Sequence, residues 1–366
     1  MTQPTDKLFA FYRLPHADHY VEIMQDSKEP RLLHSLDELD RSRGFVVVPF
    51  QVTPQTPIVL IEPDAVNQVA NDAGTQDLLP TILKRQTNRE DYHQDFLRFH
   101  QELTEGRLSK IVLSRTETIL TADALSQAVS LFHRACRLYP RMFVALVSMP
   151  NGEMWLTATP EVLLDGSGND FHTMALAGTM RLQGEELSGE GEHVRWAPKD
   201  IEEQRYVASY IADRLKTLGI DYREEGPRTV RAAHLVHLRS DFHFSLPPSV
   251  ALSRLLSTLH PTPAVCGLPK QQALDFILQH EHSQRLYYSG FMGPLNAPDS
   301  HLYVTLRCMQ ISGTRQTLYA GGGLLRESNE EQEWLETEAK LDTMRHILYN
   351  NSTFSSCRSS GVTEVP

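Results

Sequence analysis

Cysteine is scarce in this sequence, and long apolar runs are missing. The chain has 4 cysteines, which lie far apart and form no C-x-x-C pair: Cys136, Cys266, Cys308 and Cys357. This spacing argues against a disulfide framework and against a zinc site, so we expect reduced thiols. No apolar run approaches the roughly 18 residues that a membrane helix needs, and Pro4 and Pro15 interrupt the polar N-terminus. We therefore expect a cytoplasmic protein without a membrane partner.

Positive charge is also in deficit. The chain has 35 Lys and Arg against 46 Asp and Glu, a formal net charge of -11, and the basic residues form no cluster or stripe. Nucleic-acid binding depends on basic surfaces that release counterions from phosphates, so we exclude nucleic acid as a partner. With this acidic balance, an anionic substrate has to be held by a few individually placed cations.

The composition is that of an ordinary globular protein. Its 366 residues are 40% hydrophobic, which is enough for a sizeable core. Residues 1–90 contain short apolar runs, at 45–50 and 57–61, that predict strands but carry no interpretable motif. No linker or repeat divides the chain, so we predict a single α+β domain. Its parts would be a variable N-terminal part over 1–90, a main part over 91–350 and a Ser-rich disordered tail over 351–366. No long exposed apolar stripe demands a second subunit, and we expect a monomer.

Periodicity predicts the longer elements of the main part. Helices are expected over 91–103, 122–138, 198–218 and 330–349, and strands over 110–120, 142–148, 154–158, 302–311 and 316–320. The stretch 183–195, rich in Gly and Glu, is expected to be a surface loop.

The last predicted helix places charges on its apolar face. Ser328, followed three residues later by Glu331, predicts a capping box that starts the helix. At about 100° per residue, Glu333 and Lys340 then fall among apolar residues and Glu336 falls at their edge. The structural alternative is an ordinary surface pair between Glu336 and Lys340.

The predicted helix over 198–218 shows the same anomaly. Glu203 lies on its apolar face, whereas Glu202 does not. A lone buried carboxylate is costly or takes up a proton. Two helices that each present inward glutamates can instead share a hard divalent cation, and sparse carboxylates that leave room for water suit Mg²⁺.

Cations also interrupt two predicted strands. Lys110 opens an apolar strand, and Arg307 lies within the one over 302–311. For each, the structural alternative is an edge residue whose charged head reaches solvent. The glycine-rich segment 320–323 is predicted to be a turn after a strand, where backbone N–H groups can approach an anion or only reverse the chain.

A series of collinear blocks resembles the chorismate-utilising enzymes, which include isochorismate, salicylate, anthranilate and aminodeoxychorismate synthases. The blocks are KIVLSR at 110–115, ATPE at 158–161, LAGT at 176–179, KD at 199–200 with Glu203, 260–267, Arg307, the glycines 321–323, and EWxE at 333–336 with Lys340. The resemblance implies large antiparallel β-sheets flanked by helices, with chorismate bound in an active site between them. The chorismate-binding catalytic domain would then span 91–350.

The resemblance also implies roles for individual residues. Lys110 would be the general base on water that attacks C2 of chorismate, and Glu161 the general acid for the hydroxyl that leaves C4. A lysine base must be neutral and a glutamic acid must be protonated when they act. Glu203, Glu333 and Glu336 would bind Mg²⁺.

Further positions would hold the substrate. Arg307 and Lys340 would grip its carboxylates, Arg307 in a bidentate contact. The residues that would line the substrate are Gly178, Thr179, His237, Ala264, Tyr288 and Gly321.

Two alanines favour one member of the family. Ala177 stands where aminodeoxychorismate synthases typically have a nucleophilic lysine, which leaves water as the nucleophile. Ala264 resembles isochorismate synthases, whereas salicylate synthases tend to carry threonine there and to eliminate pyruvate. Gln204 departs from the histidine of many relatives, but it is not a proposed ligand, acid or base.

We therefore expect an isochorismate synthase, an isomerase (hydroxymutase) that feeds menaquinone or siderophore biosynthesis. The alternatives are a salicylate synthase, an ammonia-using anthranilate or aminodeoxychorismate synthase component, and an inactive chorismate-binding protein.

Overall fold

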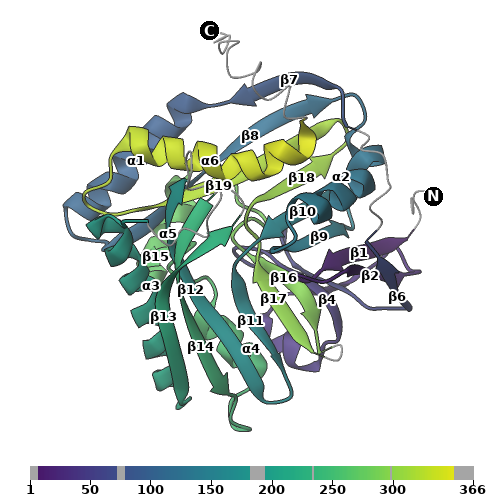
Figure 1. Ribbon diagram of the computed structural model, residues 1–366, viewed down its shortest axis with the longest axis horizontal. Coiled ribbons are helices and arrows are strands. Elements are labelled where there is room, and N and C mark those ends of the chain that lie inside the picture. The colour runs from purple at the N-terminus through teal and green to yellow at the C-terminus, as the bar shows by residue number, and fades with distance from the viewer. Residues whose placement is uncertain (1–6, 72–78, 182–193, 233–234, 297–298, 350–366) are drawn as a thin grey trace.

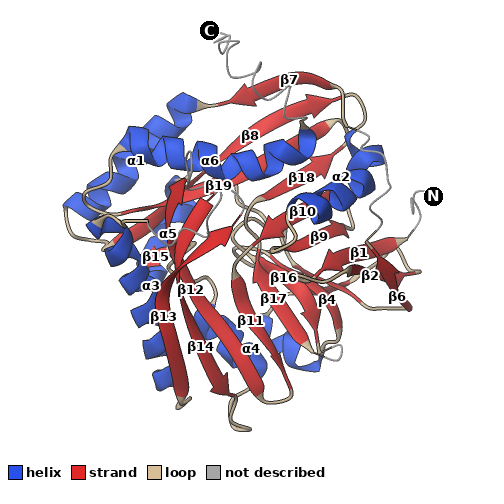
Figure 2. Cartoon of the chain, viewed as in Figure 1, coloured by secondary structure: helices blue, strands red, loops and turns tan. Residues whose placement is uncertain are grey.

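The computed structural model describes residues 7–71, 79–181, 194–232, 235–296 and 299–349 (Figure 1). The predicted tail lies outside these residues, as does most of the predicted loop over 183–195. The described residues form two large sheets flanked by helices (Figure 2). Every strand pair among them is antiparallel, so the predicted α+β class with large antiparallel sheets is confirmed.

The first sheet has the strand order β15-β8-β19-β18-β10-β9-β1-β2-β6, with β7 also paired to β8. Its strands are β1 (Leu8–Arg13), β2 (His19–Gln25), β6 (Ala65–Ala70), β7 (Ile82–Thr87), β8 (Lys110–Thr121), β9 (Phe143–Ser148), β10 (Met154–Thr159), β15 (Gly267–Leu268), β18 (Cys308–Ser312) and β19 (Arg315–Leu324).

The second sheet has the order β13-β14-β12-β11-β17-β16-β4-β5-β3. Its strands are β3 (Arg31–Leu33), β4 (Gly44–Val48), β5 (Ile58–Ile61), β11 (Val162–Ser167), β12 (Asp170–Arg181), β13 (Tyr222–Ala232), β14 (Leu235–Ser245), β16 (Phe291–Leu295) and β17 (Ser300–Val304). Residues before 90 therefore contribute strands to both sheets.

The helices are α1 (Arg89–Thr104), α2 (Ala124–Leu138), α3 (Pro198–Thr217), α4 (Leu252–Leu259), α5 (Lys270–His280) and α6 (Glu330–Leu348). The four helices expected from periodicity are all present, with ends within three residues of the predicted ones. Helices α4 and α5, and a short 3₁₀ helix over Leu36–Arg41, were not predicted.

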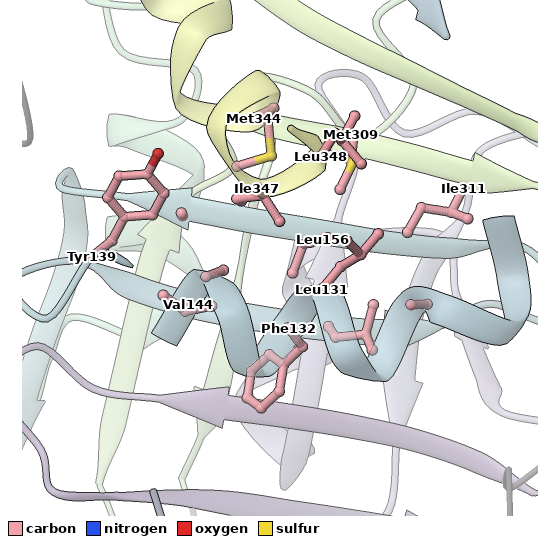
Figure 3. Close-up of a cluster of buried hydrophobic side chains, with 14 of the residues drawn as sticks. Leu131, Phe132, Tyr139, Val144, Leu156, Met309, Ile311, Met344, Ile347 and Leu348 are labelled. Atoms are coloured by element: carbon pink, nitrogen blue, oxygen red, sulfur yellow. The ribbon is translucent and has the colours of Figure 1, made fainter. Parts of the chain in front are cut away.

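Among the described residues, four apolar clusters hold the sheets and helices together, the smallest of them around α1, α5 and the start of β8. One lies between α2, α6 and the first sheet, where Leu131 of α2 and Met344 and Ile347 of α6 lie near Leu156 of β10 (Figure 3). Phe132 of α2 packs against Phe11 and Tyr20 of the same sheet. A second lies between the two sheets, and a third lies between the second sheet and helices α3 and α4. Burying each such large side chain contributes about 1.5–3 kcal/mol.

Strand β9 shows how this layering determines the sequence pattern. All six of its residues are buried. Val144 and Leu146 face the helix layer, whereas Phe143, Ala145 and Val147 face the other sheet. A strand covered on both faces is apolar throughout, which is why 143–147 reads as a continuous apolar run.

Three local predictions are wrong, and the first concerns the residue that caps the start of α6. Asn329, and not Ser328, is the N-cap of α6: its side chain accepts hydrogen bonds from the backbone N–H groups of Glu331 and Gln332. The Ser328 hydroxyl instead accepts from the backbone N–H of Leu325 at 3.0 Å. Asparagine caps a helix as well as serine does, so residue type alone does not decide whether Ser328 or Asn329 is the N-cap. The path of the backbone before the helix decides it.

The predicted strand over 302–311 is two strands in different sheets. β17 ends at Val304, β18 begins at Cys308, and Arg307 between them has φ of 45°. The predicted glycine turn is also absent among the described residues, because Gly321, Gly322 and Gly323 continue β19 and pair with β8. Glycine is needed here for close approach, since a Cβ on Gly323 would overlap the Glu203 carboxylate.

Candidate active site

A small cavity lies between the two sheets beneath α3 and α6. The chain crosses here from β10 to β11 and back from β17 to β18, and these crossings carry Glu161 and Arg307. The structure brings the following predicted residues to the cavity wall: Glu161, Gly178, Thr179, Glu203, His237, Ala264, Tyr288, Arg307, Gly321 and Lys340.

Three predicted residues, Lys110, Glu333 and Glu336, do not line the cavity. Lys110 is the first residue of β8 and is fully buried, with its Nζ 3.0 Å from Oε1 of Glu203 on α3. The alternative in which its charged head reaches solvent is therefore wrong. Burial tends to raise the pKa of Glu203, but the charges of Lys110 and Lys199 outweigh burial and lower it.

Glu161 is held by the backbone on both sides. Its N–H donates to the Thr159 hydroxyl at 3.3 Å, and its carbonyl accepts from the Val304 N–H at 3.0 Å. Its carboxyl is buried against the cavity. Burial raises its pKa to about 8, although the charges of Lys110 and Lys340 act to lower it. The carboxyl is therefore mostly protonated at neutral pH.

His237 on β14 orients the Arg307 guanidinium. The His237 Nδ1 lies 2.9 Å from the carbonyl oxygen of Gly178 and its Nε2 lies 3.2 Å from Nη2 of Arg307. Burial, together with the charges of Arg307 and Lys340, lowers the pKa of His237 well below its usual value. The ring is thus neutral, and this geometry assigns the proton to Nδ1, so that Nε2 accepts from the guanidinium.

The predicted metal ligands converge on the glycines of β19. A Cβ on Gly322 would lie 3.2 Å from Glu333 Oε2 and 3.9 Å from Glu336 Oε1, and one on Gly323 would overlap Glu203 Oε1. Burial and the charge of Glu336 raise the pKa of Glu333 to about 7. Glu333 and Glu336 thus meet at Gly322, Glu203 lies at the neighbouring Gly323, and the charges of all three act on Lys199.

Lysines neutralise these carboxylates. Lys340 Nζ lies 2.6 Å from Glu336 Oε1 and donates to the carbonyl of Gly321 at 2.8 Å, so the predicted pair with Glu336 does form. Lys199 forms an ion pair with Glu333. Among the described residues, no three Asp, Glu, His or Cys side chains already form a metal-binding group.

Two further residues belong to this site. Lys199 and Asp200 stand one helical turn before Glu203, on the first turn of α3. Burial and the charges of Glu203 and Glu336 raise the pKa of Asp200 to about 6. Both belong to the KD block at 199–200, for which no role was predicted from the sequence. The signal was present in the spacing, because residues three apart share a helix face.

The model of the family described as chorismate binding enzyme matches residues 55–349. The chain belongs to this chorismate-binding family. Isochorismate synthase MenF of Escherichia coli is 31% identical over 67% of this chain and 57% of its own length. Isochorismate synthase DhbC of Bacillus subtilis is 31% identical over 71% of this chain and 68% of its own length. The aligned part thus spans about three fifths of the length of MenF.

Solved structures share the chorismate-binding fold. The Escherichia coli MenF structure, described as a menaquinone-specific isochorismate synthase, superposes with a TM-score of 0.81 at 23% identity, covering 95% of this chain and 90% of that one. Anthranilate synthase component I from Streptococcus pneumoniae superposes with a TM-score of 0.69 at 16% identity, covering 94% of this chain and 93% of that one. No helix in the described part of the chain is both long and apolar enough to cross a membrane.

Proposed function

We propose that this member of the chorismate-binding family is an isochorismate synthase, which adds water at C2 of chorismate and expels the hydroxyl from C4. The observation that carries the proposal is a buried carboxyl, Glu161, that is mostly protonated at neutral pH and lines the same cavity as Glu203, the ion-pair partner of Lys110. A carboxyl that stays protonated at neutral pH is suited to act as a general acid.

Each group has a definite proton to move. Glu161, with a pKa of about 8, holds the proton that a departing hydroxyl needs at neutral pH. Lys110 would act in its neutral form and take the proton of the attacking water. Its Nζ is held 3.0 Å from Oε1 of Glu203, which lines the cavity. Burial of both groups excludes bulk water that would compete with the single nucleophilic water.

Two cations are available for the substrate's carboxylates. Arg307 is buried, and burial lowers its pKa to about 10, which still leaves it charged at neutral pH. Lys340 lies on α6, on the cavity wall. Isolated cations of this kind hold an anion in an otherwise acidic protein, and the planar guanidinium suits a bidentate contact.

The carboxylates fit Mg²⁺ by their chemistry and their convergence. Glu203, Glu333 and Glu336 supply the hard oxygen donors that Mg²⁺ prefers, and they approach two neighbouring glycines of β19, Gly322 and Gly323. When bound there, Mg²⁺ would hold the substrate's ring carboxylate and withdraw electron density from the ring. Lys199 and Lys340 would release the carboxylate oxygens that they now contact.

Ala177 supports water as the nucleophile. This residue is 6% exposed and lines the cavity with a methyl group, so it offers no amine to attack the ring. Relatives described as menaquinone-specific and as vibriobactin-specific both match the chain, so we propose a product and not a pathway. A monomeric state and a cytoplasmic location stay predictions of the sequence.

Product analysis tests the proposal. The purified protein is incubated with chorismate and Mg²⁺, with and without EDTA and ammonium, and the products are separated by chromatography. We expect isochorismate alone, abolished by EDTA and unaffected by ammonium. Salicylate with pyruvate, an aminated product, or no turnover would instead support the salicylate synthase, the ammonia-using synthase or the inactive binding protein.

A further inference from the structure

Helix α6 is anchored very unevenly along its length. Its C-terminal half buries Leu341, Met344, Ile347 and Leu348 in the layer over the first sheet (Figure 3). In its N-terminal half, the buried residues are Glu333 and Thr337, both polar, and Leu335 is 57% exposed. Glu333 and Glu336 lie in this half, so the carboxylates stand on the end of the helix that the apolar core does not hold.

Trp334 is the large apolar side chain that holds this end. It packs against the apolar cluster of α1, β8 and α5, and its ring lies edge-on to Tyr92 with centroids 5.0 Å apart. The guanidinium carbon of Arg115 lies 3.6 Å above the Trp334 ring, and that of Arg89 lies 4.3 Å from it. Such cation–π contacts are strongest on tryptophan and when partly desolvated.

The two arginines are themselves tied to α6. Arg115 Nε donates to the Thr337 hydroxyl at 2.6 Å, and that hydroxyl donates to the Trp334 carbonyl at 2.7 Å. Arg89 donates to Glu330 at 3.1 Å and to Glu331 at 2.8 Å. The indole therefore joins β8 and α1 to the first two turns of α6, next to Glu333 and two residues before Glu336.

We infer that Trp334, held by Arg115 and Arg89, is a positioning residue that keeps the α6 carboxylates at the spacing a divalent cation requires. Glu333 and Glu336 carry like charge beside the same glycine, Gly322, and any part of that charge that Lys199 and Lys340 do not compensate opposes the approach of this end of α6 to β19. The indole counteracts this effect. The inference rests on the proposed magnesium site, but it concerns cation affinity and not the reaction itself.

The test measures cation binding directly. Binding of Mn²⁺ and Mg²⁺ to the whole protein is followed by calorimetry in the absence of chorismate. We expect Trp334→Leu to weaken binding by roughly 10- to 100-fold, as does loss of other residues that orient metal ligands. Trp334→Phe, which keeps an aromatic face for both guanidinium groups, should recover most of the affinity. In turnover, Trp334→Leu should raise the Mg²⁺ concentration for half-maximal rate far more than the KM for chorismate.

The matched control destabilises the same helix at its other end. Ile347→Ala removes core packing from α6 and should lower the Tm while leaving cation affinity within about twofold of wild type. Equal weakening by Ile347→Ala and Trp334→Leu, unchanged affinity in Trp334→Leu, or a wild type that binds no divalent cation would each overturn the inference. If the expected affinities are found but no isochorismate forms, the inference stands and only the proposed reaction fails.

Discussion

Nζ of Lys110 lies 3.0 Å from Oε1 of Glu203, and both side chains are buried beneath Gly323. The proposed base and a proposed metal ligand therefore share one ion pair. Taking either charge away leaves the other without compensation in a buried place. A substitution at Lys110, at Glu203 or at Gly323 is therefore expected to disturb the whole ion pair.

We expect Lys110→Ala to lower kcat by about 10²- to 10⁴-fold, the usual contribution of a general base. The unpaired Glu203 should also lower the Tm. The measurement is initial rates of isochorismate formation at saturating chorismate and Mg²⁺. The control is Lys84→Ala on β7, an exposed lysine whose loss should change neither quantity. A Lys110→Ala enzyme within tenfold of wild type would remove Lys110 from the reaction.

The pKa of Glu161 sets a limit at alkaline pH. Because Glu161 must be protonated to act as an acid and its pKa in the protein without substrate is about 8, kcat/KM should fall above that pH by about tenfold per pH unit. Glu161→Gln, which cannot donate a carboxyl proton, should be inactive at every pH while remaining folded. The measurement is the pH profile of kcat/KM from 6 to 10. An undiminished rate up to pH 10 would contradict the assignment of Glu161 as the acid.

Gly323 gives a steric test of the ion pair. A Cβ there would overlap Glu203 Oε1 and lie 2.9 Å from Lys110 Cε, so Gly323→Ala should displace both side chains and abolish activity. Gly322→Ala, whose Cβ would lie 3.2 Å from a flexible Glu333 oxygen, should be milder. Isochorismate formation and cation affinity of the two variants are compared side by side. If Gly322→Ala lowered activity more than Gly323→Ala, that result would contradict the close approach of Glu203 and Lys110 to Gly323.

A separate ion network holds α6 to β8. Glu117 is fully buried and accepts two hydrogen bonds from Arg345, at 2.9 and 2.5 Å. It also forms an ion pair with Arg85, at 2.7 Å. Arg345→Met should lower the free energy of unfolding by about 3–5 kcal/mol, because it leaves the Glu117 carboxylate undercompensated. Urea unfolding measures the loss. The double variant with Glu117→Gln should recover part of it, and an Arg345→Met loss below about 1 kcal/mol would count against the network.

The inward charges illustrate what periodicity can detect. Glu203 and Glu333 were identified because each falls on the apolar face of a helix, and helix geometry places such residues in the interior wherever the helix packs. Lys110 was conspicuous for the same reason at the start of an apolar strand. Asp200 was passed over since it stands on the first, partly exposed turn of α3, where an acidic residue is ordinary.

The errors have a different origin. Strands β17 and β18 read as one strand because an apolar run carries no information about which sheet each half joins, and Arg307 between them was taken as an interruption. Gly321 to Gly323 were read as a turn because glycine is most often found there. In the folded chain they are strand residues: a Cβ on Gly321 would meet the Tyr288 hydroxyl, and Cβ atoms on Gly322 and Gly323 would meet carboxylates from two helices.

The amino-acid sequence by itself determined the local features of this protein: its helices, the apolar strands of its core, the charges on apolar faces, and the blocks that mark the chorismate-binding family. These depend on residues close together in the chain. Only the tertiary structure decided the order of strands, the crossings that bring Glu161 and Arg307 into one cavity, and the contacts of Trp334 with β8 and α1. The cavity that Glu161 and Arg307 share and the contacts of Trp334 join residues more than a hundred positions apart. Their partners are selected by packing, which local propensity does not encode.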